Sequence, residues 1–194
     1  MSLCTTEPWL GTTRGVLSQL RNDDKVRAWI SEAEVITIYT GDNDVWDMLY
    51  GLREGSRTCG SASDPDMDCI RAGEAAIEEN IDAILSEILA LRSADEALTL
   101  IADGCNIYVP WWQEAGIFEE LKGPGYEDWS KAIDRLAEKY GVVAVHTYIA
   151  CNGPEGDEPI PANLLVPSEW FHFNEAGHRM AADLHRAAGY EHGQ

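Results

Sequence analysis

Two short segments carry residue types and spacings that suit acyl-transfer chemistry. In the first, Glu169 precedes His172 by three residues, and His178 follows. If this segment makes a single turn, the carboxylate can bind one imidazole nitrogen and leave the other free to act as a base. The alternatives are a solvated ion pair and metal binding by Glu169, His172 and His178. No further ligand cluster favours a metal, and we expect neither a metal nor another cofactor.

The second segment is Gly41-Asp42-Asn43-Asp44, one residue after the run Val35–Tyr39, which is rich in β-branched residues. An Asn43 side-chain amide at the end of a strand can donate to a developing oxyanion. An aspartate at the start of the next helix can cap it. The alternative is an ordinary strand-to-helix turn, in which Asn and Asp side chains only satisfy backbone groups.

Alternating strands and helices must position these segments. The hydrophobic pattern predicts buried strands at Val35–Tyr39, Ala97–Ala102 and Val142–Val145. It predicts helices at Gly15–Ile30 (broken at Asn22-Asp23-Asp24), Trp46–Gly51, Ile70–Leu91, Asp128–Tyr140 and Asn174–Ala188. Loops are expected at Gly51–Asp68, at Pro110-Trp111-Trp112 and at Cys151–Pro161.

Helical segments between the strands predict right-handed crossovers and a parallel sheet. Ligands of such sheets lie beyond the carboxyl ends of the strands. We therefore expect Gly41–Asp44, Asp103–Pro110 and His146–Cys151 to lie on one rim.

Composition narrows the class of protein. The 194 residues fit one domain, 1–194, and the formal charge of −20 opposes binding to nucleic acid or to anionic membranes. No apolar run is long enough to span a bilayer, and no signal peptide is evident. Two cysteine pairs are candidate disulfides, Cys59–Cys69 and Cys105–Cys151, and the first pair is the favoured one. Cys4 would then have no partner within the chain. The alternative is five free thiols. The localisation stays open, and a Cys59–Cys69 disulfide would favour an extracytoplasmic site.

In combination, three blocks resemble the SGNH, or GDSL, hydrolase family. Gly41–Asp44 matches its G-x-N-D block, and Glu169-x-x-His172 with Asn174–His178 looks like its D-x-x-H-P-N-x-x-G-H block. Trp9–Thr13 is similar to the block whose glycine NH serves the oxyanion hole. The blocks occur in family order over nearly the whole chain. The resemblance implies an α/β fold, a three-layer αβα sandwich of the flavodoxin-like SGNH type with a parallel sheet.

The chain departs from that family at its start. No G-D-S sequence, which carries the family's serine nucleophile, occurs, and only ten residues precede Gly11. We therefore expect an N-terminally truncated version of the fold. Glu169 replaces the usual Asp and Phe173 the usual Pro, and neither change removes a functional group.

The resemblance implies an ester hydrolase acting on small acyl or acetyl esters. His172 would be the general base, Glu169 would orient it, and Asn43 and the Gly11 NH would hold the oxyanion. The nucleophile is unknown, with Ser2 and Cys4 as weaker substitutes and a water activated by His172 as another route.

The alternative is a non-catalytic ligand-binding or interaction module. Seven tryptophans, among them Trp9, Trp46, Trp111, Trp112 and Trp170 near the expected rim, could line its cleft. Ordinary packing would equally explain Trp111 and Trp112.

Without the family's first two strands, Val35–Tyr39 becomes an exposed edge strand. We expect this edge to be paired in a homo-oligomer, a domain swap or a complex with a second polypeptide.

Overall fold

A parallel sheet of three strands lies at the centre of the computed structural model, which describes residues 11–54, 59–61, 63–169 and 171–190. Its strands are β1 (Val35–Tyr39), β4 (Leu98–Ala102) and β5 (Val143–Val145), in the order β1-β4-β5. Both pairings are parallel, as the sequence predicts. The predicted strand bounds differ from the observed ones by at most one residue.

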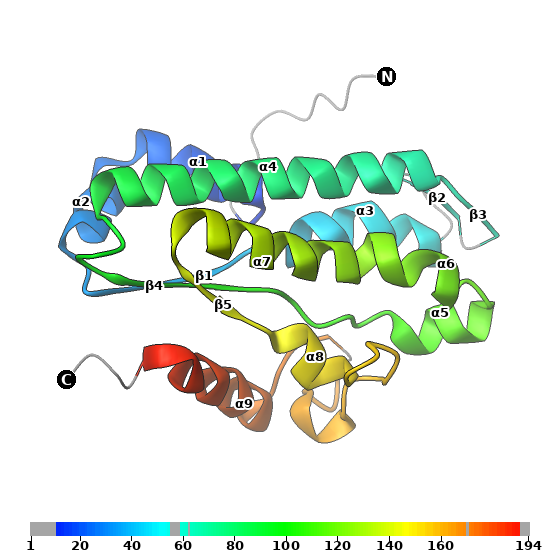
Figure 1. Ribbon diagram of the computed structural model, residues 1–194. Helices are drawn as coiled ribbons and strands as arrows, with labels where there is room; N and C mark the ends of the chain where they lie inside the picture. Colours follow the sequence, from blue (N-terminus) through cyan, green and yellow to red (C-terminus); the bar gives the residue numbers. More distant parts are fainter. Residues whose placement is uncertain (1–10, 55–58, 62, 170, 191–194) are drawn as a thin grey trace.

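Helices cover the sheet on both sides, so the fold has three layers (Figure 1). On one side lie α1 (Thr13–Asn22), α3 (Asp42–Glu54), α4 (Met67–Leu91) and α7 (Asp128–Tyr140). The stripe of α4 residues Ile77, Ile81, Ile84, Leu85 and Ile88 is buried in the main core. Burial of this stripe, rather than local propensity, stabilises the helix.

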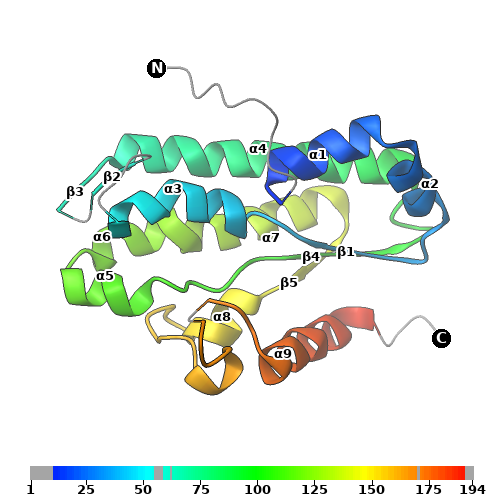
Figure 2. The same cartoon turned by 180° about the vertical axis from the view of Figure 1, so that it is seen from behind.

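The other face is covered by α9 (Glu175–His185) and the π-helical turn η3 (Arg186–Tyr190), best seen in Figure 2. Leu184 and Ala188 pack against Leu100, Ala102 and Val145 of β4 and β5. These contacts confirm the predicted αβα layering.

Strand β1 forms an edge of the sheet among the described residues, because β4 alone pairs with it. Ile36 and Ile38 are buried in the main core, whereas Val35 is 37% and Tyr39 50% exposed. The interpretation of this run as a fully buried strand is therefore wrong. The edge position is as expected, and the contacts of α9 reach β4 and β5 but leave the outward face of β1 open.

The predicted break in the first helical segment is confirmed. Asp23 ends α1 and its carboxylate accepts hydrogen bonds from Lys25 and Val26 at the start of α2 (Asp24–Glu32). Asp23 therefore caps α2 while it interrupts the run.

Several short elements differ from the sequence predictions. Pro110-Trp111-Trp112 is not a loop but part of α5 (Val109–Ala115), where Pro110 occupies a first-turn position that needs no N–H. Helix α3 begins earlier and ends later than predicted, and α8 (Thr147–Asn152) extends into the expected Cys151–Pro161 loop.

The expected loop Gly51–Asp68 contains the end of α3, the strands β2 (Gly60–Ser61) and β3 (Asp64–Pro65), and the start of α4. Three further elements were not predicted: α6 (Phe118–Lys122), the π-helical turn η1 (Gly123–Glu127) and the 3-10 turn η2 (Ala162–Leu164).

Both candidate disulfides are formed. Cys59 bonds to Cys69 and Cys105 to Cys151, with Cα atoms 5.3 and 5.7 Å apart. Two disulfides are compatible with an oxidising, extracellular compartment. Within the part of the chain that the structure describes, we find no helix with both the length and the apolarity needed to cross a bilayer.

Candidate active site

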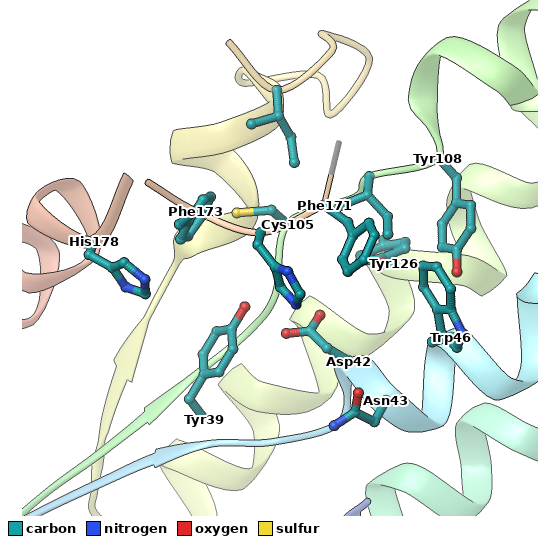
Figure 3. A pocket seen from close by; sticks show the side chains of 13 residues that line it. Tyr39, Asp42, Asn43, Trp46, Cys105, Tyr108, Tyr126, Phe171, Phe173 and His178 are labelled. Carbon is teal, nitrogen blue, oxygen red and sulfur yellow. The ribbon is translucent and has the colours of Figure 1, made fainter. Parts of the chain in front are cut away.

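A pocket of about 520 Å³ opens at the carboxyl end of β1 and β4 (Figure 3). Part of the lining comes from the end of β1 and the segments after β1 and β4, and another part from Ile160 and the segment 171–178. It is lined by Tyr39, Asp42, Asn43, Trp46, Cys105, Ile107, Tyr108, Tyr126, Ile160, Phe171, His172, Phe173 and His178. Two sequence-predicted site residues, Asn43 and His172, therefore face one cavity although they are far apart in the chain.

Asn43 lies in the first turn of α3, held against the segment that precedes α1. Its Nδ2 donates to the Gly11 carbonyl at 2.8 Å. Next to it, the Asp44 carboxylate accepts hydrogen bonds from the Thr13 backbone N–H and hydroxyl, both at 2.8 Å. The structure thus brings Gly11 and Asn43 together, but Gly11 does not line the pocket. Trp9 and Leu10 of the same block lie outside the described residues.

Glu169 and His172 form the predicted pair. The Glu169 carboxylate binds Nδ1 of His172, because the backbone turns between them. The Glu169 N–H donates to the Val166 carbonyl, and the Val166 N–H donates to the His172 carbonyl, each at 2.9 Å. With Nδ1 occupied, Nε2 is the imidazole nitrogen left for proton transfer. The His172 side chain is 63% exposed, so water reaches it.

The third candidate, His178, lies on the first turns of α9 and lines the same pocket. Its ring meets the Phe173 ring edge-on, with centroids 6.0 Å apart. Across the described residues, no three His, Cys, Asp or Glu side chains are arranged to hold a metal ion, the Glu169, His172 and His178 set included.

Asp42 and Tyr39 form a second polar pair in the pocket, which the sequence did not single out. The Tyr39 hydroxyl hydrogen-bonds to the Asp42 carboxylate, and Figure 3 shows the two groups pointing toward one another. Burial raises the pKa of Asp42 to about 6; the Tyr39 hydrogen bond opposes this rise, and Asp103 and Asp44 add to it. Burial of its hydroxyl and then the Asp42 charge raise the pKa of Tyr39, although its ring is half exposed.

Glycines make room for Asp42. A Cβ at Gly104, two residues after β4, would lie 2.1 Å from the Asp42 Oδ1 atom and 2.7 Å from the Trp129 ring. Gly41 has φ of +123°, and a Cβ there would also meet Trp129 at 2.7 Å. Gly41 and Gly104 therefore let the Asp42 carboxylate sit between the strand ends and α7.

Aromatic side chains form the rest of the wall. The Trp46 and Phe171 rings pack with centroids 5.3 Å apart, and Tyr108 lies 6.3 Å from Trp46. Trp111 and Trp112 do not line this pocket. Trp112 is 2% exposed and stacks on Tyr108, so ordinary packing explains it. Trp9 and Trp170 lie outside the described residues.

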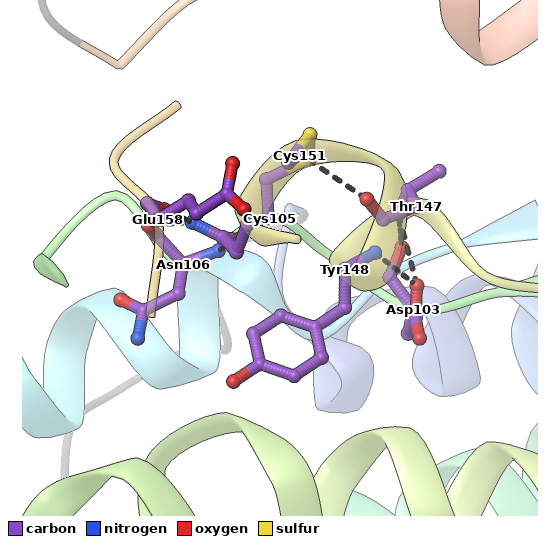
Figure 4. The surroundings of a disulfide bond; sticks show 8 residues. Asp103, Cys105, Asn106, Thr147, Tyr148, Cys151 and Glu158 are labelled. Atoms are coloured by element: carbon purple, nitrogen blue, oxygen red, sulfur yellow. Dashed lines mark hydrogen bonds between the residues drawn. A yellow bond between two sulfur atoms is a disulfide. The ribbon is translucent and has the colours of Figure 1, made fainter. Parts of the chain in front are cut away.

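The predicted rim is formed, but it divides into two sides. The Asp103 carboxylate is buried and accepts hydrogen bonds from Ser130, Thr147 and the Tyr148 N–H, and the Cys105–Cys151 disulfide lies beside it (Figure 4). These bonds join the strand ends of β4 and β5. His146 instead faces a separate pocket beside α7, with its ring nitrogens 3.4 Å from Asp103 and 3.2 Å from Asp134.

A serine nucleophile is not found among the described residues that line the pocket, and the Cys105 sulfur is held in a disulfide. The two substitutes named from the sequence, Ser2 and Cys4, lie outside the described residues. The pocket therefore contains an imidazole bound by a carboxylate (His172 with Glu169), the side-chain amide of Asn43, and a wall of apolar and aromatic side chains.

Comparison with solved structures places this architecture among known folds. The chain shares its overall fold with a lipase. That protein comes from a goat rumen metagenome; the TM-score is 0.69 at 18% identity, and the match covers 92% of this chain and 74% of the lipase. No protein-family model matches the sequence, and no curated protein matches it significantly. At this identity the likeness concerns the fold alone.

Proposed function

We propose that this protein is an ester hydrolase of the SGNH, or GDSL, type that acts on small acyl or acetyl esters. The observation that carries the proposal is that Asn43 and the Glu169-bound His172 face one pocket at the carboxyl end of a parallel sheet. The shared fold with a lipase supports the same reaction class.

The chemistry follows from the donors and acceptors in the pocket. His172 accepts the proton of the attacking hydroxyl group through Nε2, and the Glu169 carboxylate stabilises the imidazolium that forms. The carbonyl oxygen becomes negative as the new C–O bond forms. The Asn43 amide stabilises this oxyanion with the Nδ2 hydrogen that does not bond to the Gly11 carbonyl. When the tetrahedral intermediate collapses, the alkoxide leaves and takes the proton back from His172.

Two sources of the hydroxyl group fit the proposal. A water activated directly by His172 needs nothing beyond the described residues, since this imidazole is exposed. A serine nucleophile would have to come from outside the described residues that line the pocket. The two routes differ in their response to a serine-directed phosphonate, which inactivates only the second.

The test is hydrolysis of p-nitrophenyl acetate by the parent and by His172→Ala. Removal of the base should lower the rate by about 10²- to 10⁴-fold. The matched control is His185→Ala, because His185 lies on α9, outside the lining of the pocket, and bonds to the Ala181 carbonyl. Equal rates of p-nitrophenyl acetate hydrolysis for His172→Ala and the parent would contradict the proposal.

A second candidate function is a ligand-binding module without turnover. The apolar and aromatic lining favours it, since Trp46, Tyr108 and Phe171 would bind a ligand whether or not a nucleophile is present. Saturable quenching of tryptophan fluorescence by acyl ligands, with no turnover, would support this function over hydrolysis.

We also propose a second copy of the chain as partner. Among the described residues β4 alone pairs with β1, which leaves one side of this strand without a neighbouring strand, and Val35 and Tyr39 are exposed. Two β1 strands related by a twofold axis would pair along this side and bury both side chains.

A further inference from the structure

Asp42 carries a carboxylate in the pocket whose charge is not balanced there. The described residues that line the pocket include no lysine or arginine. Among the described residues, Asp42 forms no ion pair; its partner is the neutral Tyr39 hydroxyl. Nearby charges are negative as well, since Asp103 and Asp44 both act on it. A half-buried carboxylate without a counter-charge is costly, and a bound cation would remove that cost.

The walls around this carboxylate are aromatic. Tyr39 hydrogen-bonds to it, and Trp46 and Phe171 stand along the same pocket (Figure 3). The negative faces of aromatic rings attract organic cations, and quaternary ammonium groups are held in this way. Lysine-like ammonium groups on water-exposed stems gain less, because they remain hydrated.

The charge of the whole molecule acts in the same direction. A formal charge of −20 attracts small cations and repels anionic esters such as phosphates and carboxylates. The apolar lining separately favours a ligand whose charge is spread over methyl groups.

We propose that the ester bound in this pocket carries an organic ammonium group, held by Asp42 and by the rings of Trp46 and Phe171. This inference rests on the proposed function for the ester part of the ligand. Asn43 directly follows Asp42, so an ester carbonyl at the Asn43 amide would lie a short spacer away from the ammonium group. Esters of short amino alcohols have this layout.

The experiment compares two ligands of nearly equal shape, choline and 3,3-dimethylbutanol, in which a carbon replaces the charged nitrogen. Binding is measured by titration calorimetry and tryptophan fluorescence, so that it needs no turnover. Choline should bind the parent roughly tenfold or more tightly than the neutral isostere. Equal affinity of the two ligands would overturn the inference.

Variants assign the preference to named groups. Asp42→Asn should abolish the preference for choline while the affinity for 3,3-dimethylbutanol is kept. The matched control, Asp47→Asn, removes one charge from the same helix outside the pocket and should keep the preference. Trp46→Leu keeps an apolar side chain but removes the aromatic ring. It should therefore weaken the binding of choline and leave the binding of 3,3-dimethylbutanol unchanged. A preference for choline that survives in Asp42→Asn would refute the role of this carboxylate.

The outcomes separate this inference from the proposed function. Hydrolysis of p-nitrophenyl acetate that depends on His172, without a preference for choline, keeps the hydrolase and refutes the cation site. A preference for choline that depends on Asp42, without any hydrolysis, keeps the cation site and refutes the hydrolase.

Discussion

Replacing Asp42 with asparagine should stabilise the protein at alkaline pH, although it removes a group proposed to bind ligand. Burial raises the pKa of Asp42 from 3.8 to about 6. A folded-state pKa above the unfolded value means that the folded state binds the proton more strongly. The contribution of Asp42 to the free energy of unfolding therefore falls as the pH rises from about 4 through 6 and is then constant.

The magnitude follows from the size of the shift. A change from 3.8 to about 6 corresponds to roughly 3 kcal/mol. Because Asp42 is only half-buried and solvent screens its charge, we expect Asp42→Asn to gain about 1–2 kcal/mol at pH 8. The carbonyl oxygen of the new amide side chain still accepts the Tyr39 hydrogen bond, so the substitution leaves this donor satisfied.

Urea unfolding, followed by tryptophan fluorescence with the disulfides intact, measures this gain at pH 8 and at pH 4. The control is Asp95→Asn, which removes an exposed carboxylate before β4 and should change stability by less than about 0.5 kcal/mol. An Asp42→Asn variant that is no more stable than the parent at pH 8, or that gains the same stability at both pH values, would contradict the burial of this charge as the cause.

Three further predictions test other parts of the structure. Gly104→Ala should displace Asp42 and cost about 1–3 kcal/mol in unfolding free energy, because its Cβ would lie 2.1 Å from the Asp42 Oδ1 atom; calorimetry with choline should show weakened binding. Replacing Cys105 and Cys151 by alanine should cost about 2–4 kcal/mol and loosen the β4–α8 junction, measured by urea unfolding and by hydrogen exchange. Thr37→Lys should shift a β1-paired dimer to monomers in sedimentation velocity, whereas a monomeric parent would exclude that pairing.

The strands and long helices could be predicted from the sequence because their signals are local. Val35–Tyr39 is β-branched, and Ile77, Ile81, Ile84 and Ile88 recur at the spacing of one helix face. The Glu169–His172 pair is equally local, since one turn brings residues three apart into contact.

The short helices could not be predicted from such local patterns. α5, α6 and α8 have five to seven residues each, too few for a periodic signal or for stability on their own. They form because Trp112, Leu121 and Tyr148 are buried against the rest of the core. Helices of this length depend on tertiary packing, which no local window contains.

The sequence by itself determined the alternation of strands and helices, the Gly41–Asp44 turn and the carboxylate-steered His172. Only the tertiary structure decided what these groups face. Asp42 looks like any helix-capping aspartate in sequence, and Tyr39 like an outward residue of an edge strand. They share a pocket with Phe171 because parallel strand ends and a distant C-terminal loop meet at one rim. Such a meeting depends on how the chain packs over more than a hundred residues, whereas a local pattern reports only on neighbours along one element.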